Sequence, residues 1–184
     1  MKWLDICSCP VNPDVIRLKP DNLLYVSPAL EFAQMLPDND FPHGVDYDWI
    51  ASDNAGRLAI FTNAGEGPIP SSALTWLDDM ASTISRMIAD MPELCAGEML
   101  ISYPNSESFI ELGKRGFFVY DWQLSNKSKH DPQYAMVCTP SAPIGIGDLG
   151  DALREFAQKT CFSALQFENG NTIDPTRYFT CVER

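Results

Sequence analysis

Two β-prone runs on either side of a tight turn constrain the fold of this chain most. In the first run, YDWIAS at 47–52, Tyr47, Trp49 and Ala51 alternate with the residues between them. The second run is LAIFT at 58–62, and the turn signal Asn54-Ala55-Gly56 separates the two. Alternation with a period of two is typical of a β-strand, because successive side chains point to opposite faces. The segment therefore predicts an antiparallel hairpin.

The clearest helical pattern follows the hairpin and spans roughly residues 72–91. Its apolar residues recur at the three- and four-residue spacing that places them on one face of a helix, whereas acids and serines fall on the other face. Ser71 or Ser72 is the expected N-cap, and Pro92 ends the pattern. The predicted apolar stripe consists of Ala73, Leu74, Leu77, Met80, Ala81, Ile84, Met87, Ile88 and Met91.

The remaining pattern predicts short strands and helices in one domain. It indicates strands at Met99–Tyr103, Gly116–Gln123, Tyr134–Thr139, Cys161–Phe167 and Tyr178–Val182, and helices at Pro28–Leu36, from Asn105 or Ser106 to Gly113, and at Asp148–Thr160. Residues 1–44 are punctuated by six prolines, which allow only short elements there. We expect a single α+β domain over residues 1–184, in which residues 45–184 form an antiparallel sheet with helices packed against it.

Charge excludes one large class of partner. The chain of 184 residues has a formal net charge of −12, and the segment from Pro20 to Gly56 contains no lysine or arginine. Binding to nucleic acid requires clustered basic side chains, so we expect no nucleic-acid partner. The seven acids of this segment form either a solvated face or a docking surface for a basic protein. They are Asp21, Glu31, Asp38, Asp40, Asp46, Asp48 and Asp53.

Cysteine usage and the N-terminal sequence favour the cytoplasm. The six cysteines lack the dense, regular spacing of a disulfide scaffold, and most lie in apolar runs, so we expect free thiols. The N-terminal segment is too short and too polar for a signal peptide, and no run is long enough to span a membrane. We therefore expect a cytoplasmic protein that does not enter a membrane.

Two glycine-rich segments raise the question of a nucleotide site. In AGEGPIPSS, at 64–72, Glu66 would repel a phosphate, two prolines remove N–H donors, and the lysine of a P-loop is missing. The second segment, Gly145–Gly150, matches G-x-G-x-x-G, with Glu168 further along. Two prolines separate it from the preceding strand, and Asp148 adds negative charge where a pyrophosphate would bind. We expect both segments to be structural and no cofactor to bind.

Other catalytic or metal-binding motifs are weak. The histidines are His43 and His130, each near a proline in a predicted loop, and Cys7-Ser8-Cys9 lacks the second close pair of a structural zinc site. Asp46 and Asp48 share one face of a strand, which suits acid–base chemistry or the solvent side of a hairpin equally well. We therefore predict neither a metal site nor an assigned catalytic residue.

Two blocks resemble a pattern found in small bacterial proteins. The first block, YDWIASDNAGRLAIFTNAGEGPIP, lies within Val45–Pro70, and the second runs from GFFVYDWQ to YAMVCTPSAPI over Gly116–Ile144. Proteins similar to this pattern include immunity proteins encoded beside secreted polymorphic or Rhs-type toxins. Such a protein binds one toxin and neutralises it inside the producing cell. The pattern consists of aromatic and glycine positions and carries no catalytic residues.

The resemblance implies a cytoplasmic, non-enzymatic inhibitor that covers the active site of a basic toxin. Opposite charge accelerates such binding, which makes the acids the expected contact residues. We predict partner contacts at Asp38, Asp40, Asp46, Tyr47, Asp48, Asp53 and Glu66. The alternative is a small-molecule-binding domain or an enzyme that uses the Gly145–Gly150 loop or a pocket centred on His43.

Overall fold

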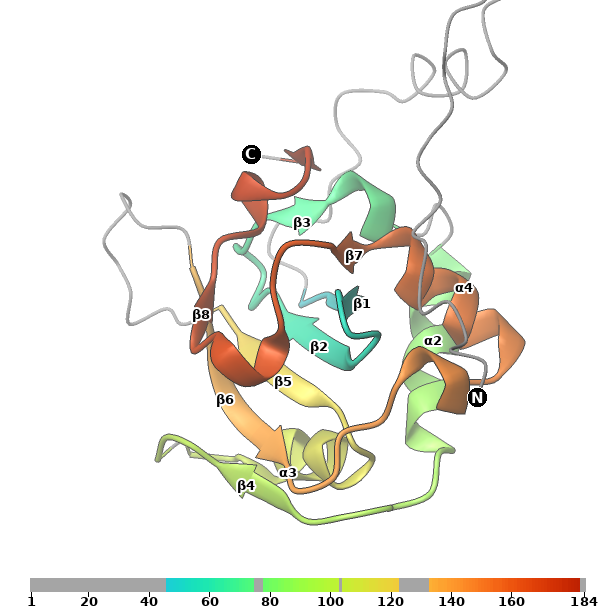
Figure 1. Ribbon diagram of the computed structural model, residues 1–184, viewed down its shortest axis with the longest axis vertical. Helices are drawn as coiled ribbons and strands as arrows, with labels where there is room; N and C mark the ends of the chain where they lie inside the picture. Colours follow the sequence, from blue (N-terminus) through green and yellow to red (C-terminus); the bar gives the residue numbers. More distant parts are fainter. Residues whose placement is uncertain (1–45, 75–77, 103, 123–132, 183–184) are drawn as a thin grey trace, which may run out of the picture.

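The sheet is the organising element of the fold (Figure 1). The computed structural model describes residues 46–74, 78–102, 104–122 and 133–182. Within these residues a seven-stranded sheet has the order β4-β6-β5-β2-β1-β7, and β8 also pairs with β6. Its strands are β1 Asp48–Asp53, β2 Leu58–Thr62, β4 Gly97–Met99, β5 Phe118–Asp121, β6 Tyr134–Pro140, β7 Cys161–Phe162 and β8 Thr172–Ile173. A separate two-stranded sheet joins β3 Ile69–Pro70 to β9 Cys181–Val182.

The predicted hairpin is confirmed. Strands β1 and β2 pair antiparallel, and Trp49 lies opposite Phe61. Asp53 closes the turn, because its Oδ1 accepts hydrogen bonds from the N–H groups of Ala55 and Arg57, each at 2.9 Å. A side-chain acceptor that binds backbone N–H groups two and four residues further on fixes the chain reversal.

The sheet is mixed rather than purely antiparallel. Strands β5 and β6 pair antiparallel as expected, as do β4 with β6 and β6 with β8. Two neighbours are parallel, β2 with β5 and β1 with β7. Each parallel pair joins strands that are separated by a helical crossover, as parallel pairing requires. The class is therefore α+β, with a mostly antiparallel sheet.

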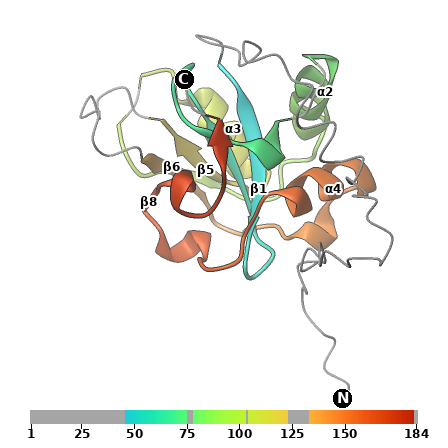
Figure 2. The ribbon, with the colours of Figure 1, turned by 90° about the horizontal axis from the view of Figure 1, so that it is seen from above.

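Each face of the sheet is covered by a different part of the chain. On one face, Trp49, Phe61 and Tyr120 pack with Phe162 and Phe167 of the C-terminal segment. On the other face, Ile50 and Ile60 pack against the helices. Figure 2 shows the strands between α3 and the red C-terminal segment. The helices are α2 Asp78–Ala89, α3 Glu107–Lys114 and α4 Asp151–Lys159. Because both faces are covered, β1 is buried from Trp49 to Asp53.

The start of the long helix differs from the prediction. Ser71–Ala73 form a 3-10 turn (η1), Leu74 is extended with ψ 112°, and α2 is described from Asp78 onward. The two serines make tertiary contacts instead of capping a helix. Ser71 Oγ donates to the Thr180 carbonyl at 2.7 Å, and Ser72 Oγ lies 2.9 Å from Thr160 Oγ1. The predicted end is close to correct, because α2 stops at Ala89, before Pro92.

The second half of the chain follows the prediction in part. Helix α3, with Ser106 at its N-cap, and strands β5 and β6 are confirmed. The expected helix from Asp148 begins at Asp151, after a 3-10 turn at Ile146–Asp148 (η2). The expected strand Cys161–Phe167 is reduced to two residues, and further 3-10 turns lie at Phe167–Asn169 (η3) and Pro175–Arg177 (η4).

Some predictions concern residues that the structure does not describe, and others can be compared with it only for the described residues. The predicted helix Pro28–Leu36 and most of the polar loop at 124–133 fall outside the described part of the chain. Within it, Cys95 and Cys138 are free thiols, as expected. Among the helices described there, none has both the length and the apolar composition needed to cross a membrane.

Candidate functional site

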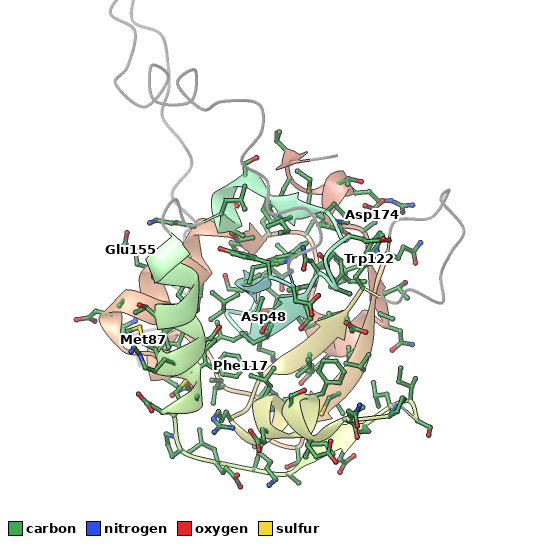
Figure 3. The ribbon with its side chains drawn as sticks, turned by 180° about the vertical axis from the view of Figure 1, so that it is seen from behind. Asp48, Met87, Phe117, Trp122, Glu155 and Asp174 are labelled. Carbon is green, nitrogen blue, oxygen red and sulfur yellow. The ribbon has the colours of Figure 1, made fainter. Side chains whose placement is uncertain are left out.

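Three polar residues line up across one end of the sheet. Asp48 of β1 lies opposite Thr62 of β2, and Thr62 lies opposite Asp121 of β5. Residues in register share a face of a sheet, so this polar row continues the face that carries Ile50 and Ile60. Asp48, labelled in Figure 3, lies on this helix-covered face. We call Asp46, Asp48, Thr62 and Asp121 the acidic sheet end.

Loss of water and nearby negative charge disfavour the ionised forms of two carboxyl groups of the acidic sheet end, those of Asp48 and Asp121. Asp121 is 3% exposed, and burial, followed by the negative charges of Asp46 and Asp48, raises its pKa to about 6. Asp48 is exposed as a residue, but the protein around its carboxyl group removes water from it and raises its pKa; a hydrogen bond from Thr62 opposes the shift, and the charge of Asp46 adds to it. Loss of water disfavours the charged form of an acid, and a neighbouring like charge has the same effect.

Basic side chains do not neutralise this charge within the part of the chain that the structure describes. The ion pairs found there connect other acids, such as Glu93 with Lys114 and Asp151 with Arg154. Asp46, Asp48 and Asp121 take part in none of them. The acidic sheet end is therefore a concentration of negative charge that no ion pair among the described residues neutralises.

A crevice lies beside the acidic sheet end, between α2 and α3. It has a volume of about 180 Å³, and Asp48 is one of its lining residues. The side chains of Ile50 and Ile60 form its floor on the sheet. Ile84, Ser85, Ile88 and Ala89 line it from α2, and Ser108, Glu111 and Leu112 line it from α3, with Arg115 just beyond that helix.

Arg115 closes this crevice structurally rather than supplying a free cation. Its Nε donates to the Met91 carbonyl at 3.2 Å, Nη1 to the Glu111 carbonyl at 2.8 Å, and Nη2 to the Ala89 carbonyl at 3.0 Å. These contacts tie the end of α2 to α3 and satisfy carbonyls at a helix C-terminus. The guanidinium group therefore serves the fold but keeps its positive charge, and two lining acids, Asp48 and Glu111, outnumber it.

The structure separates the predicted contact residues into different environments. Asp38 and Asp40 lie outside the described residues, whereas Asp46 and Asp48 are exposed at the acidic sheet end. Tyr47 is half-buried, and its hydroxyl donates to the Ala73 carbonyl at 3.3 Å. Glu66 is exposed in the loop after β2.

Asp53 does not belong with the other predicted contact residues. It is 1% exposed, and besides its two bonds in the hairpin turn its Oδ2 accepts from the Phe167 N–H at 2.9 Å. Both carboxylate oxygens therefore bind backbone inside the fold. We assign Asp53 a structural role and remove it from the candidate surface.

The loop after β2 is folded around Asn63 rather than around an anion site. Asn63 Oδ1 accepts from the N–H of Gly65 at 3.0 Å, and the Asn63 carbonyl accepts from Glu66 at 3.0 Å and Gly67 at 2.7 Å. These three consecutive amides are therefore engaged within the loop. Gly67 is required by close packing, because a Cβ there would lie 2.6 Å from Tyr134 Oη.

The Gly145–Gly150 segment is also closed by its own contacts. Asp148 Oδ2 accepts from the Gly145 N–H at 2.8 Å, and the Gly145 carbonyl accepts from the Asp148 N–H at 2.9 Å. Arg154 donates to the carbonyls of Ile146 and Leu149, at 3.2 and 2.6 Å. The segment connects β6 to α4 and places a carboxylate where a dinucleotide pyrophosphate would need N–H donors.

The remaining candidates for chemistry add no second site. His43, His130, Cys7 and Cys9 lie outside the described residues. Within the described ranges, no group of three or more histidine, cysteine, aspartate or glutamate side chains is arranged to hold a metal ion. Sequence analysis missed Asp121, although one signal was present: an acid at the end of the apolar run GFFVY.

Comparisons with protein-family models, curated proteins and solved structures found no match to this chain. The functional argument therefore depends on the acidic sheet end and the crevice beside it.

Replacing Asp121 by asparagine is expected to stabilise the protein at pH 7.5 by about 3 kcal/mol at most, since one pKa unit corresponds to about 1.4 kcal/mol. The folded-state pKa is raised from 3.8 to about 6, so the folded state binds this proton more tightly than the unfolded state does. Ionisation therefore costs stability between about pH 4 and pH 6, and the cost is fully present above pH 6. Denaturant unfolding of both proteins at several pH values measures the difference.

The control for this experiment is Glu98→Gln, which removes an exposed acid on the edge strand β4. The advantage of Asp121→Asn should disappear near pH 4, whereas the control should change little at any pH. An equal effect of Asp121→Asn at pH 4 and pH 7.5 would show that Asp121 is not destabilised by ionisation.

Proposed function

We propose that this protein is a cytoplasmic immunity protein that binds a cognate antibacterial toxin and blocks its active site. The observation that carries the proposal is the acidic sheet end, where the negative charges of Asp46 and Asp48 raise the pKa of Asp121 and none of the three acids forms an ion pair among the described residues. Carboxylates that raise one another's pKa are stabilised when a cationic surface docks on them. A basic toxin supplies such a surface.

The overall charge and the resemblance of the two sequence blocks to immunity proteins support the same proposal. A net charge of −12 accelerates association with a basic partner and discourages binding to nucleic acid. The glycine segments are engaged in internal hydrogen bonds, which is the behaviour of structural loops. The proposed contact surface comprises Asp46 and Asp48, with Asp121 behind them, and extends toward Tyr47 and Glu66.

The proposal is tested in cells that express the toxin domain encoded beside this gene. Co-expression of this protein should restore the colony count to that obtained with an inactive toxin variant. The double variant Asp46→Asn/Asp48→Asn should protect less well at equal abundance, because it removes two exposed charges from the contact surface. Glu98→Gln should protect fully. Failure of the wild-type protein to protect, although it accumulates in folded form, would contradict the proposed function.

A further inference from the structure

We propose that the crevice between α2 and α3 receives one long cationic side chain, a lysine or an arginine, from the toxin. This inference depends on the proposed function and assigns a specific role to one part of the contact surface. It rests on the shape of the crevice, its apolar floor and the sign of the charge at its mouth.

The crevice has the size and the lining for a single extended side chain. Its volume of about 180 Å³ is smaller than the roughly 300–1,000 Å³ typical of sites for whole metabolites. Ile50 and Ile60 on the floor, with Ile84, Ile88 and Leu112 on the walls, present methyl and methylene groups. Lysine and arginine bury their methylene stems against such surfaces while the charged head reaches polar groups.

The charge at the mouth of the crevice selects a cation. Asp48 lines the crevice. The negative charge of Asp46 raises the pKa of Asp48, and the charges of Asp46 and Asp48 raise the pKa of Asp121, so the three carboxyl groups lie close together. Glu111, which is exposed on α3, adds a second lining carboxylate. The lining arginine, Arg115, already donates to three backbone carbonyls. These bonds point the guanidinium at backbone carbonyls and leave its positive charge in place. The lining acids Asp48 and Glu111 outnumber this one cation, and Asp46 and Asp121 add negative charge nearby, so a cationic head beside Asp48 would meet a net negative charge.

An alkyl cation fits this site better than a metal ion does. Among the described side chains, no three or more histidine, cysteine, aspartate or glutamate residues are grouped so that they could hold a metal ion. The apolar floor would also contribute nothing to a hydrated metal ion, whereas it stabilises a methylene stem.

The inference is tested with a small probe on the full chain, without the toxin. The protein is titrated with butylguanidinium and, separately, with the neutral analogue butylurea, and NMR chemical shifts are recorded. Butylguanidinium should shift the signals of Ile50, Ile60 and Ile84 and bind at least fivefold more tightly than butylurea. Asp48→Asn should remove most of this preference, whereas Glu98→Gln should keep it.

A second variant tests the location. Ser85→Leu places a larger apolar group at the crevice and should weaken butylguanidinium binding at least fivefold, while thermal unfolding confirms that the variant is folded. Equal binding of both probes, or shifts confined to another part of the sheet, would overturn the inference.

The toxin experiment separates this inference from the proposed function. Selective probe binding without toxin protection would leave the crevice as a cation site and reject the immunity function. Protection without selective probe binding would retain the immunity function and reject the crevice as the contact that receives a cationic side chain.

Discussion

Asp53→Ala is expected to lower the free energy of unfolding by about 4 kcal/mol, because a buried polar group left without a partner costs about 1–3 kcal/mol. The Asp53 carboxylate accepts hydrogen bonds from the N–H groups of Ala55, Arg57 and Phe167, all at 2.9 Å. Two of these donors belong to the hairpin turn, and the third begins the η3 turn of the C-terminal segment. Alanine would leave all three without their acceptor and release that segment from the hairpin.

The matched variant is Asp53→Asn, which keeps one acceptor oxygen in nearly the same position. It should lose about half as much stability, because Oδ1 can still bind Ala55 and Arg57 while an amide nitrogen faces the Phe167 N–H. Denaturant unfolding measures both losses, and hydrogen exchange at Phe167 reports the lost contact directly. Losses below about 1 kcal/mol for both variants would contradict the structural role of Asp53.

Phe61→Ala is expected to cost about 4–5 kcal/mol, at the upper end of the range for removing a buried aromatic ring. Phe61 is fully buried, with its ring stacked on Trp49 at 4.0 Å and on Tyr120 at 4.8 Å between centroids. Its ring also contacts those of Tyr134, Phe162 and Phe167. Each such aromatic pair contributes about 0.5–1.5 kcal/mol of stability beyond the burial of its apolar area. The contributions of pairs within one cluster are not fully additive.

The melting temperature should fall by about 10 °C or more, since about 1 kcal/mol shifts it by roughly 2–4 °C in a domain of this size. Tyr178→Ala is the control. Tyr178 is 42% exposed, and its ring contacts that of Phe162 at 5.3 Å. Its removal should cost about 1 kcal/mol or less. Similar losses for Phe61→Ala and Tyr178→Ala would show that the aromatic cluster is not the centre of this core.

Local sequence patterns predicted the parts of the fold that local interactions determine. The hairpin could be predicted because the alternating pattern, the Asn54-Ala55-Gly56 turn and the two β-prone runs all lie within about sixteen residues. Over that short stretch, the turn residues and the strand pattern both indicate the same antiparallel pairing. Helix α3 could be predicted from Ser106 and the apolar spacing after it. The start of α2 could not, because Ser71 and Ser72 bind Thr180 and Thr160, which are distant in sequence.

The candidate site was predictable only in part for the same reason. Asp46 and Asp48 were visible as acids on one face of a strand. Their neighbour Asp121 depends on the parallel pairing of β2 with β5, which no local pattern specifies. Asp53 looked like another member of the acidic surface, yet its carboxylate faces backbone N–H groups inside the fold. The crevice requires α2 and α3 to be placed beside each other and could not be predicted from either helix alone.

The central claim is tested most directly with the product of the gene beside this one, which the proposal requires to be a toxin. This protein is titrated into that purified product while its toxic activity is measured. Blocking of the active site predicts that activity falls in proportion to the protein added and reaches its minimum at equimolar amounts. The Asp46→Asn/Asp48→Asn variant should require a higher concentration for the same inhibition, with a weaker dependence on salt. Full toxin activity in the presence of excess folded protein would contradict the account, and inhibition by far less than equimolar protein would indicate an enzyme instead.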